Sequence, residues 1–245
     1  MSVKRGKNNF EIIFDHPEYI IVDKPAGMLS VPERFTEEVS LRRLLNDRFG
    51  KIYVVHRLDK FTSGIILFAK NEESHKIWND LFEKRRVTKK YLAITSGLFR
   101  EDSGLIDLPI LSLPGQNRVV INKRGKSSQT KFRVLEQLRN HAFVELDLLT
   151  GRTHQIRVHL MTYGNPLLVD PVYGGETEFY VSEIKGKGRY HLEKGTVERP
   201  LLTRTPLHAH RLSFIDPFDK EERSFEVEMP KDMRATLYQL EKWNR

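Results

Sequence analysis

The amino-acid sequence predicts an α+β fold in which helices flank a mostly antiparallel or mixed central β-sheet. Three observations support this prediction. Strand-like runs outnumber helical ones, turn sequences suited to hairpins join many of them, and the helical stretches fall between groups of strands without regular strand–helix alternation. The sequence contains no internal repeat and no low-complexity linker.

In the first part of the chain, short strands are predicted around Ile12 and Ile20, separated by the turn sequence DHP. Ser40 is suited to cap a helix that ends at Gly50. The strand IYVV, the polar segment HRLDKFTS and the strand GIILFA follow. Asn71 then caps a second helix, and the strand TKKYLAITSG comes after it.

In the second part, residues 105–149 indicate a meander of four strands, LIDLPI, RVVI, TKFRVLE and HAFVELDLL. The segment GRTHQIRVHLMTYG predicts a helix that ends at Gly164. LHAHRLSFI and SFEVEM predict two late strands, and an amphipathic helix is expected from about Lys231. Residues 174–200, rich in glycine and charge, indicate an insertion loop or a small lobe.

Length and composition limit the class of protein. A chain of 245 residues can bury a sizeable core, and we expect one domain over residues 10–245 after a basic tail, residues 1–9. The absence of cysteine excludes disulfides, thiol catalysis and cysteine-ligated metals. No apolar run is long enough for a membrane span and no secretory leader is recognisable, so we expect a soluble cytoplasmic protein.

The charge pattern points to a polyanionic partner. The formal net charge is +8, and residues 84–100 and 118–133 each carry six basic residues and no acid. Most runs of charged residues are simply solvated surface. In these two stretches, however, aromatic residues lie between the basic ones, which points toward nucleic acid as the partner. The basic residues that we take as candidates for RNA contact are Lys89, Lys90, Lys123, Arg124 and Lys126.

The segment HRLDKFTS places Arg57 and Asp59 between two apolar strands. A loop there projects from the edge of a sheet, and such loops commonly carry functional residues. The residue types alone favour a plainer interpretation, a structural turn with Arg57 and Asp59 paired at the surface.

The order of the motifs changes that balance. Four blocks occur in sequence: IIVDKPAGMLSVP (20–32), HRLDKFTSG (56–64), KKYLA with Tyr91 (89–93) and TGRTHQIRVH (150–159). Together they resemble the signature motifs of the RluA family of pseudouridine synthases, over about Phe10 to Met229. The resemblance implies the pseudouridine synthase catalytic fold. The early start of the motifs favours the compact branch without an N-terminal S4-type module.

The resemblance implies isomerisation of uridine in RNA, in which the C1′–N1 bond breaks, the uracil rotates and C5 is joined to C1′. Asp59 would be the catalytic carboxylate. It can attack or electrostatically support a cation-like sugar carbon, or act as a base toward the 2′ position, and the sequence leaves these routes open. No cofactor and no metal are implied. The spacing of His154 and His159 is unsuited to a shared helical face, so we expect structural hydrogen bonds from them.

Three further residues match the family motifs. Arg157 is expected to pair with Asp59, to lower the pKa of that carboxyl and to fix its direction. Tyr91 is expected to stack on the flipped uracil, and Arg57 to enter the space that the base leaves. The implied partner is structured ribosomal or transfer RNA, and we expect a monomer.

Two alternatives remain at this stage. One is a noncatalytic RNA-binding protein on the same fold, against which the intact Asp59, Tyr91 and Arg157 argue. The other is a glycosidase, which needs a second carboxylate close to Asp59, where the motifs supply arginines instead.

Overall fold

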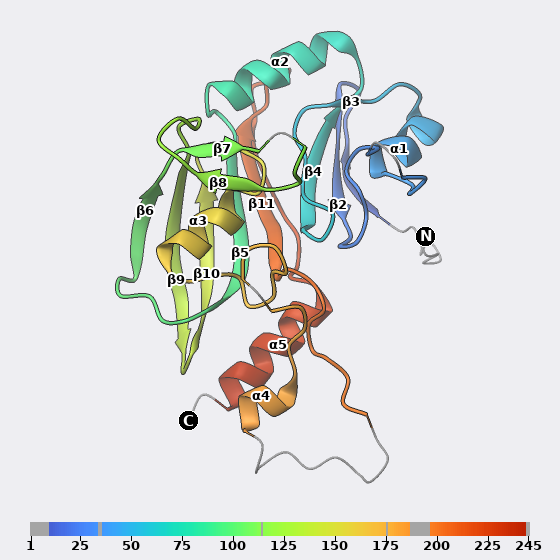
Figure 1. Ribbon diagram of the computed structural model, residues 1–245. Coiled ribbons are helices and arrows are strands. Elements are labelled where there is room, and N and C mark those ends of the chain that lie inside the picture. The colour runs from blue at the N-terminus through green and yellow to red at the C-terminus, as the bar shows by residue number, and fades with distance from the viewer. Residues whose placement is uncertain (1–9, 34–35, 114, 175, 187–196, 244–245) are drawn as a thin grey trace. The chain divides into compact units, whose positions relative to one another are not determined.

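The computed structural model describes residues 10–33, 36–113, 115–174, 176–186 and 197–243 (Figure 1). The predicted basic tail (1–9) and residues 175 and 187–196 of the predicted insertion lie outside the described residues. Contacts divide the chain into two compact units: unit 1 is Met1–Lys89 with Ala209–Glu228, and unit 2 is Lys90–His208 with Met229–Arg245. The single domain expected over residues 10–245 stays a prediction.

Unit 1 combines strands with two helices. Its elements are β1 (Glu11–Asp15), β2 (Tyr19–Lys24), α1 (Leu41–Phe49), β3 (Tyr53–Val54), β4 (Ser63–Ala69), α2 (Glu72–Glu83), β11 (Leu207–Ile215, from Ala209 onward) and β12 (Glu222–Glu226). The strands are arranged in the order β1-β2-β4-β11, with β3 paired to β4 and β12 paired to β11. The β1–β2, β2–β4, β3–β4 and β11–β12 pairs are antiparallel.

The core of unit 1 follows from its apolar strands. All seven residues of β4 are buried, and α2 packs against β3 and β4. Trp78 of α2 is fully buried in a cluster with Tyr19, Leu67 and Phe214. Both predicted helix starts are confirmed: Ser40 accepts a hydrogen bond from the N–H of Arg43, and Asn71 caps α2.

Unit 2 contains most of the remaining strands. Its elements are β5 (Thr88–Ser96, from Lys90 onward), β6 (Ser103–Asp107), β7 (Ile110–Ser112), β8 (Val119–Ile121), β9 (Gln129–Leu138), β10 (His141–Leu148), α3 (Gln155–Tyr163), α4 (Val181–Lys185) and α5 (Lys231–Lys242). Four strands form a sheet in the order β5-β10-β9-β6, and β7 pairs with β8 in a separate hairpin. These pairs are antiparallel.

One predicted strand is divided in two. Residues 105–110 were expected to form a single strand, but β6 ends at Asp107 and β7 begins at Ile110. Pro109 lies between them and has no N–H to donate, so a continuous ladder cannot pass through it. The chain changes partner there, from β9 to β8.

Helix α3 lies between the hairpin and the sheet of unit 2, in contact with β8 and β9. Six of its residues in succession, from Gln155 to Leu160, are buried. The predicted helix is therefore buried on more than one side, because hairpin residues Ile110 and Val119 pack against Val158. Helix α5 lies beside α4 and buries Met233 in a second cluster of unit 2 (Figure 1).

The predicted α+β class is confirmed by this arrangement. Within the described residues, no helix has both the length and the apolar character that crossing a membrane requires.

Candidate active site

Asp59 lies on the loop that joins β3 to β4 in unit 1, as the sequence predicted. Its side chain is half-buried, whereas that of Arg57 is exposed. The strand β4 starts four residues after Asp59, so the loop is attached directly to a strand whose residues are all buried. Half-burial leaves the carboxylate accessible to a substrate while the protein limits its freedom.

Ser30 fixes the backbone just before Asp59. The Oγ of Ser30 donates to the carbonyl of Leu58 at 2.7 Å and accepts from the N–H of Leu58 at 3.1 Å. A single buried hydroxyl thus satisfies both backbone groups of this residue. Ser30 belongs to the first sequence block, which the sequence alone did not connect to the position of Asp59.

Lys24 fixes the backbone just after Asp59. Its side chain is fully buried, and its ammonium donates to the carbonyls of Pro25, Met28 and Lys60 at 3.0, 2.8 and 3.1 Å. The N–H of Gly27 reaches the same Lys60 carbonyl at 2.8 Å. These contacts make Lys24 a scaffold residue, and the segment that it supports is the loop of Asp59.

Gly64, where the loop enters β4, permits a close approach of two backbones. Its φ is +111°, and a Cβ built there would lie 2.2 Å from the carbonyl oxygen of Ala209. Only glycine fits both conditions, since a side chain is disfavoured at this φ and has no space. The glycine of the HRLDKFTSG block is therefore needed for packing.

His56 holds the beginning of the loop and is a poor candidate for proton transfer. Its Nε2 accepts a hydrogen bond from the N–H of Leu67 at 3.0 Å. Burial, together with the positive charge of Lys89, lowers the pKa of His56 to about 3. The imidazole is thus neutral near pH 7, as an accepting nitrogen must be.

Arg157 lies on α3 in unit 2 and forms a buried ion pair with Asp170. Its Nε and Nη2 donate to Oδ2 and Oδ1 of Asp170, both at 2.7 Å, and the two side chains are 9% and 1% exposed. The sequence did not reveal Asp170, which lies in the apolar run PLLVD. The predicted partner, Asp59, belongs to unit 1, and the Arg157–Asp59 contact stays a prediction.

Tyr91 lies on β5, opposite Leu146 of β10, and its side chain is 5% exposed. A ring in this position is held by the sheet and does not need to be ordered when a base arrives. Its stacking on uracil stays a prediction, as does the entry of Arg57 into the space left by the base.

The five basic candidates for RNA contact differ in their surroundings. Lys89 is buried, with its ammonium 5.3 Å from the centre of the Phe82 ring, and Lys90 forms an ion pair with Glu145 at 3.0 Å. The other three are exposed in one turn after β8: Lys123, Arg124 and Lys126.

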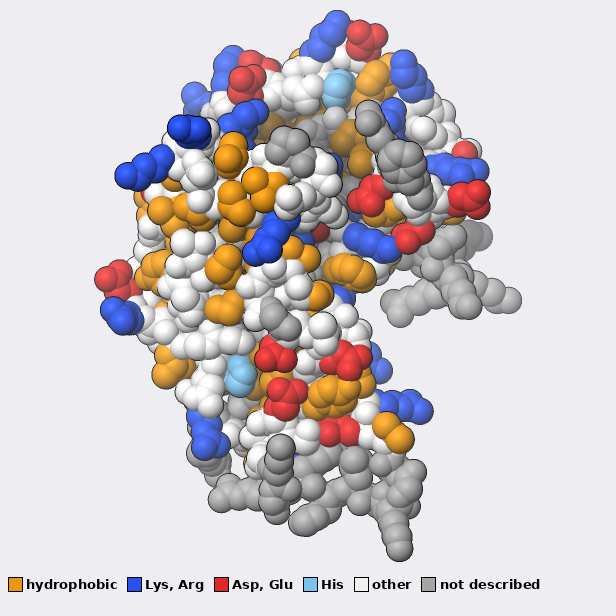
Figure 2. All heavy atoms as spheres, in the orientation of Figure 1, with side chains coloured by type: hydrophobic (Ala, Val, Ile, Leu, Met, Phe, Trp, Pro, Cys, Tyr) orange, Lys and Arg blue, Asp and Glu red, His pale blue; other side chains and the backbone are white. Residues whose placement is uncertain are grey.

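Hydrogen bonds hold this turn in place. The N–H of Gly125 donates to the carbonyl of Asn122 at 2.8 Å, and Lys126 exchanges two backbone hydrogen bonds with Ile110 of β7. We call residues 122–126 the basic turn. Figure 2 shows Lys and Arg side chains on the surface near the loops of the β7–β8 hairpin.

The histidines in the motif blocks bond within the protein, as expected. The two ring nitrogens of His159 lie 3.0 Å from Oγ1 of Thr130 and 3.0 Å from the carbonyl oxygen of Leu108. Such bonds explain their burial without a metal.

One group of side chains in unit 1 has the composition of a metal site. His16, Asp216 and Asp219 place ligand atoms within 4.8 Å of one another. However, Arg223 donates to both carboxylates, and the hydroxyl of Tyr19 donates to Asp216. The Arg223 guanidinium already pairs with both carboxylates, so the group is best described as an ion-pair network.

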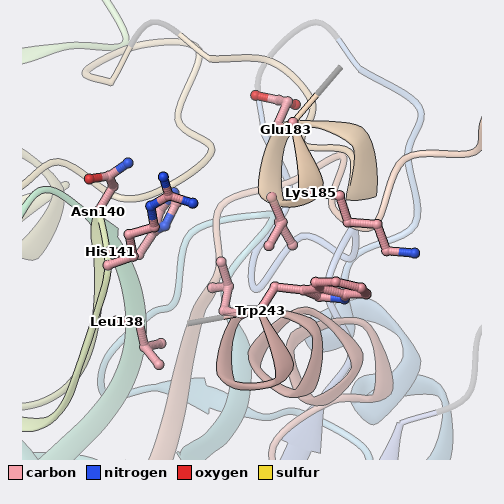
Figure 3. A pocket seen from close by; sticks show the side chains of 10 residues that line it. Leu138, Asn140, His141, Glu183, Lys185 and Trp243 are labelled. Atoms are coloured by element: carbon pink, nitrogen blue, oxygen red, sulfur yellow. The ribbon is translucent and has the colours of Figure 1, made fainter. Parts of the chain in front are cut away.

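Unit 2 also contains a hollow of about 310 Å³ between the β9–β10 turn, α4 and the end of α5. Figure 3 shows Lys185 extending over the ring of Trp243, 4.8 Å from its centre, with Glu183 on the same short helix. None of the predicted site residues lines this hollow. Its lining combines one acid, Glu183, with the basic residues Arg139 and Lys185, and Figure 2 shows Asp and Glu side chains on the surface near α4.

Comparisons with known proteins agree with the motifs and the fold. The family model described as RNA pseudouridylate synthase matches residues 18–162, a range that includes Asp59, Tyr91 and Arg157. The ribosomal large subunit pseudouridine synthase D of Buchnera aphidicola subsp. Schizaphis graminum is 32% identical over an alignment of 238 residues that covers 94% of this chain and 73% of the relative. The dual-specificity RNA pseudouridine synthase RluA of Vibrio vulnificus is 36% identical over an alignment of 218 residues that covers 84% of this chain and 78% of the relative.

Two solved structures have a similar fold. Human RNA pseudouridylate synthase domain containing 1 matches with a TM-score of 0.66 and 28% identity, over 92% of this chain and 86% of that chain. Human RNA pseudouridylate synthase domain containing 4 matches with a TM-score of 0.70 and 24% identity, over 94% and 93%. The chain belongs to the RNA pseudouridylate synthase family. It is a pseudouridine synthase and therefore an isomerase, which confirms the family and the class of reaction predicted from the motifs.

Proposed function

We propose that this pseudouridine synthase modifies specific uridines in structured ribosomal RNA, transfer RNA or both, with Asp59 as its catalytic carboxylate. The names of the relatives support this substrate class, since one is named for the large ribosomal subunit and another for dual specificity. The main support for the assignment of Asp59 is that the backbone of its loop is held in place on both sides. The residues on both sides of it, Leu58 and Lys60, are held by buried hydrogen bonds to Ser30 and Lys24.

The chemistry suits a single carboxylate. When the C1′–N1 bond breaks, C1′ becomes electron-poor, and the Asp59 carboxylate can stabilise or attack it, or take a proton from C2′. The uracil then rotates and C5 bonds to C1′. C5 gives up its hydrogen to solvent and N1 gains one, so no atom or electron is gained overall. The reaction therefore needs no cofactor.

The other site residues have distinct proposed roles. Arg157 contacts and orients Asp59, Tyr91 stacks on the extruded uracil, and Arg57 fills the gap in the RNA. Stacking of a base on an aromatic ring contributes roughly 1–3 kcal/mol, comparable with the cost of unstacking a nucleotide. The exposed position of Arg57 suits a residue that must reach into RNA.

We place the main phosphate contacts of unit 2 on the basic turn. Its three cations are exposed on a turn that is already ordered, so little entropy is lost when RNA binds. The surface over α4 instead carries the acids Glu176, Glu178, Glu183 and Glu198, which disfavour a polyanion. Lys89 and Lys90 remain candidates, although both already have partners within the protein.

We also propose that the enzyme acts as a monomer in the cytoplasm. The mass of the protein in solution, measured with and without RNA, tests the first part. We expect one protein chain per particle both without RNA and in the RNA complex, and a concentration-dependent dimer would contradict this expectation.

The assignment of Asp59 is tested with defined ribosomal and transfer RNA transcripts and chemical mapping of pseudouridine. We expect the wild-type protein to form pseudouridine at discrete positions and Asp59→Ala to form none. Asp80→Ala is the matched control, because Asp80 is an exposed carboxylate of the same unit that pairs with Lys84 on α2. A wild-type protein without activity on any cellular RNA would refute the proposed substrate class, and an active Asp59→Ala variant would refute the role of Asp59.

A further inference from the structure

Backbone groups of its own turn hold the carboxylate of Asp170 in place, in addition to the bonds from Arg157. Its Oδ1 accepts hydrogen bonds from the N–H groups of Val172 and Tyr173, both at 3.1 Å, and its own carbonyl accepts from the N–H of Gly174 at 2.7 Å. The segment 170–174 thus forms a tight turn around the carboxylate. A carboxylate held in this way cannot rotate to follow a moving partner.

Asp170 then fixes the plane of the Arg157 guanidinium. Two parallel hydrogen bonds of 2.7 Å, donated by Nε and Nη2 to the carboxylate, define both the position and the orientation of the planar group. Because the pair is almost completely buried, water does not compete for these bonds. The pair also carries no net charge, so Arg157 acts on a neighbour mainly through directed N–H groups.

Tyr173 covers the same guanidinium. The guanidinium carbon of Arg157 lies 5.1 Å from the centre of the Tyr173 ring, within the range of cation–π contacts. Asp170 therefore holds the edge of the guanidinium, and Tyr173, three residues later in the same turn, packs on it.

The Tyr173 hydroxyl joins this arrangement to two other elements. It accepts a hydrogen bond from the N–H of Val119 on β8 at 2.9 Å, and it lies 3.1 Å from Nδ1 of His154. His154 precedes α3 and has a left-handed backbone with φ of 50°, an unfavourable conformation for a residue with a side chain. Its bond to Tyr173 therefore helps to fix the start of the helix that carries Arg157.

We propose that Asp170 and Tyr173 are positioning residues for Arg157, which set the direction of its guanidinium and hold the β7–β8 hairpin in register with it. This inference rests on the proposed function, because Arg157 is taken to contact Asp59. Neither residue is required to touch the substrate. Both act through Arg157.

The kinetic test uses single-turnover conversion of uridine. We expect Asp170→Asn to lower the rate roughly 100-fold, because the amide N–H₂ cannot accept from the guanidinium and a small displacement at a reacting centre has effects of this size. We expect Tyr173→Phe to lower the rate about tenfold through loss of one anchoring hydroxyl. RNA affinity should change less than about threefold in both variants.

The matched control is Asp232→Asn. Asp232 forms an ion pair of the same bidentate geometry with Arg204 in unit 2, at 2.6 and 2.8 Å. Loss of a structural ion pair predicts lower thermal stability with an unchanged rate. If Asp232→Asn lowered the rate as much as Asp170→Asn, a general structural effect would explain both and the positioning role would be wrong.

A double-mutant comparison separates positioning from independent effects. In Arg157→Lys, the planar bidentate pairing is already lost, so adding Asp170→Asn should change the rate by less than about threefold. A further loss close to 100-fold would show that Asp170 acts independently of Arg157 and would overturn the proposal.

A spectroscopic readout does not depend on activity. The Nε–H of Arg157, assigned as the NMR signal that disappears in Arg157→Lys, should exchange slowly with solvent in the wild-type protein and faster in Asp170→Asn and Tyr173→Phe. Fast exchange in the wild type would refute the fixed guanidinium. If Asp170→Asn does not fold, Tyr173→Phe gives the same comparison. An inactive wild type with a slowly exchanging signal would instead refute the proposed function while supporting the positioning.

Discussion

The replacement Lys24→Met tests how the loop of Asp59 is held. Methionine has a similar length and fills the same space, but it cannot donate to the carbonyls of Pro25, Met28 and Lys60. The substitution therefore removes the hydrogen bonds of a fully buried ammonium while it preserves packing.

The expected loss in the free energy of unfolding follows from the carbonyls that lose a hydrogen-bond donor. The Lys60 carbonyl keeps the N–H of Gly27, whereas the carbonyls of Pro25 and Met28 lose the ammonium, and an unsatisfied buried group costs about 1–3 kcal/mol. Part of this cost is offset because methionine, unlike lysine, carries no charge that must be desolvated on folding. We expect a loss of about 2–4 kcal/mol in the free energy of unfolding, and a decrease in Tm of about 5–15 °C for a chain of this size.

The assay combines thermal unfolding with single-turnover kinetics. Because Lys60 is next to Asp59, the rate should also fall, by about tenfold or more. Lys76→Met is the control, since Lys76 forms an ion pair with Glu72 in which both side chains are more than half exposed, and its loss should cost less than about 0.5 kcal/mol. A Lys24→Met variant with unchanged Tm and unchanged rate would refute the argument that this ammonium holds the loop.

Three further predictions concern packing, pH and RNA binding. Gly64→Ala should destabilise the protein by about 2–5 kcal/mol in urea unfolding, because a methyl group meets the backbone of Ala209, whereas Gly50→Ala, with space around it, should cost only about 1 kcal/mol; equal effects would contradict the close approach. Burial and the charge of Glu11 raise the pKa of Asp23 to about 6, so stability should fall as the pH rises from about 4 to 6. Asp23→Asn should then raise the Tm by roughly 2–3 °C at pH 7 but not at pH 3.5, and a benefit that persists at pH 3.5 would rule out ionisation as the cause. Neutral replacement of the three cations of the basic turn should weaken RNA binding and reduce the slope of log affinity against log salt by up to about three units, and an unchanged slope would place the phosphate contacts elsewhere.

Local signals in the sequence were sufficient for much of the fold. The caps at Ser40 and Asn71 and the apolar run of β4 each depend on neighbouring residues, so the sequence predicted them correctly. The break at Pro109 was also locally encoded, but the prediction missed it because the apolar residues around the proline suggested one continuous strand. The wide burial of α3 was not predictable, because it depends on a hairpin some forty residues away in the chain.

The candidate site, like the fold, could be predicted only in part from the sequence. The position of Asp59 and Arg57 between two strands follows from the order of polar and apolar residues. The residues that hold the site do not follow from it, because Lys24 and Asp170 act through contacts between segments that are distant in sequence. A lysine beside an aspartate in β2 gave no sign that its side chain would be buried.

The most direct test of the account is release of tritium from RNA labelled at C5 of uridine, since this hydrogen leaves only when C5 is joined to C1′. Wild-type protein and Asp59→Asn, which preserves the shape of the side chain, are compared in single turnover at equal RNA occupancy. The account predicts that the wild type releases tritium and that Asp59→Asn binds RNA normally but releases none above background. Release by Asp59→Asn at a rate near that of the wild type would contradict it.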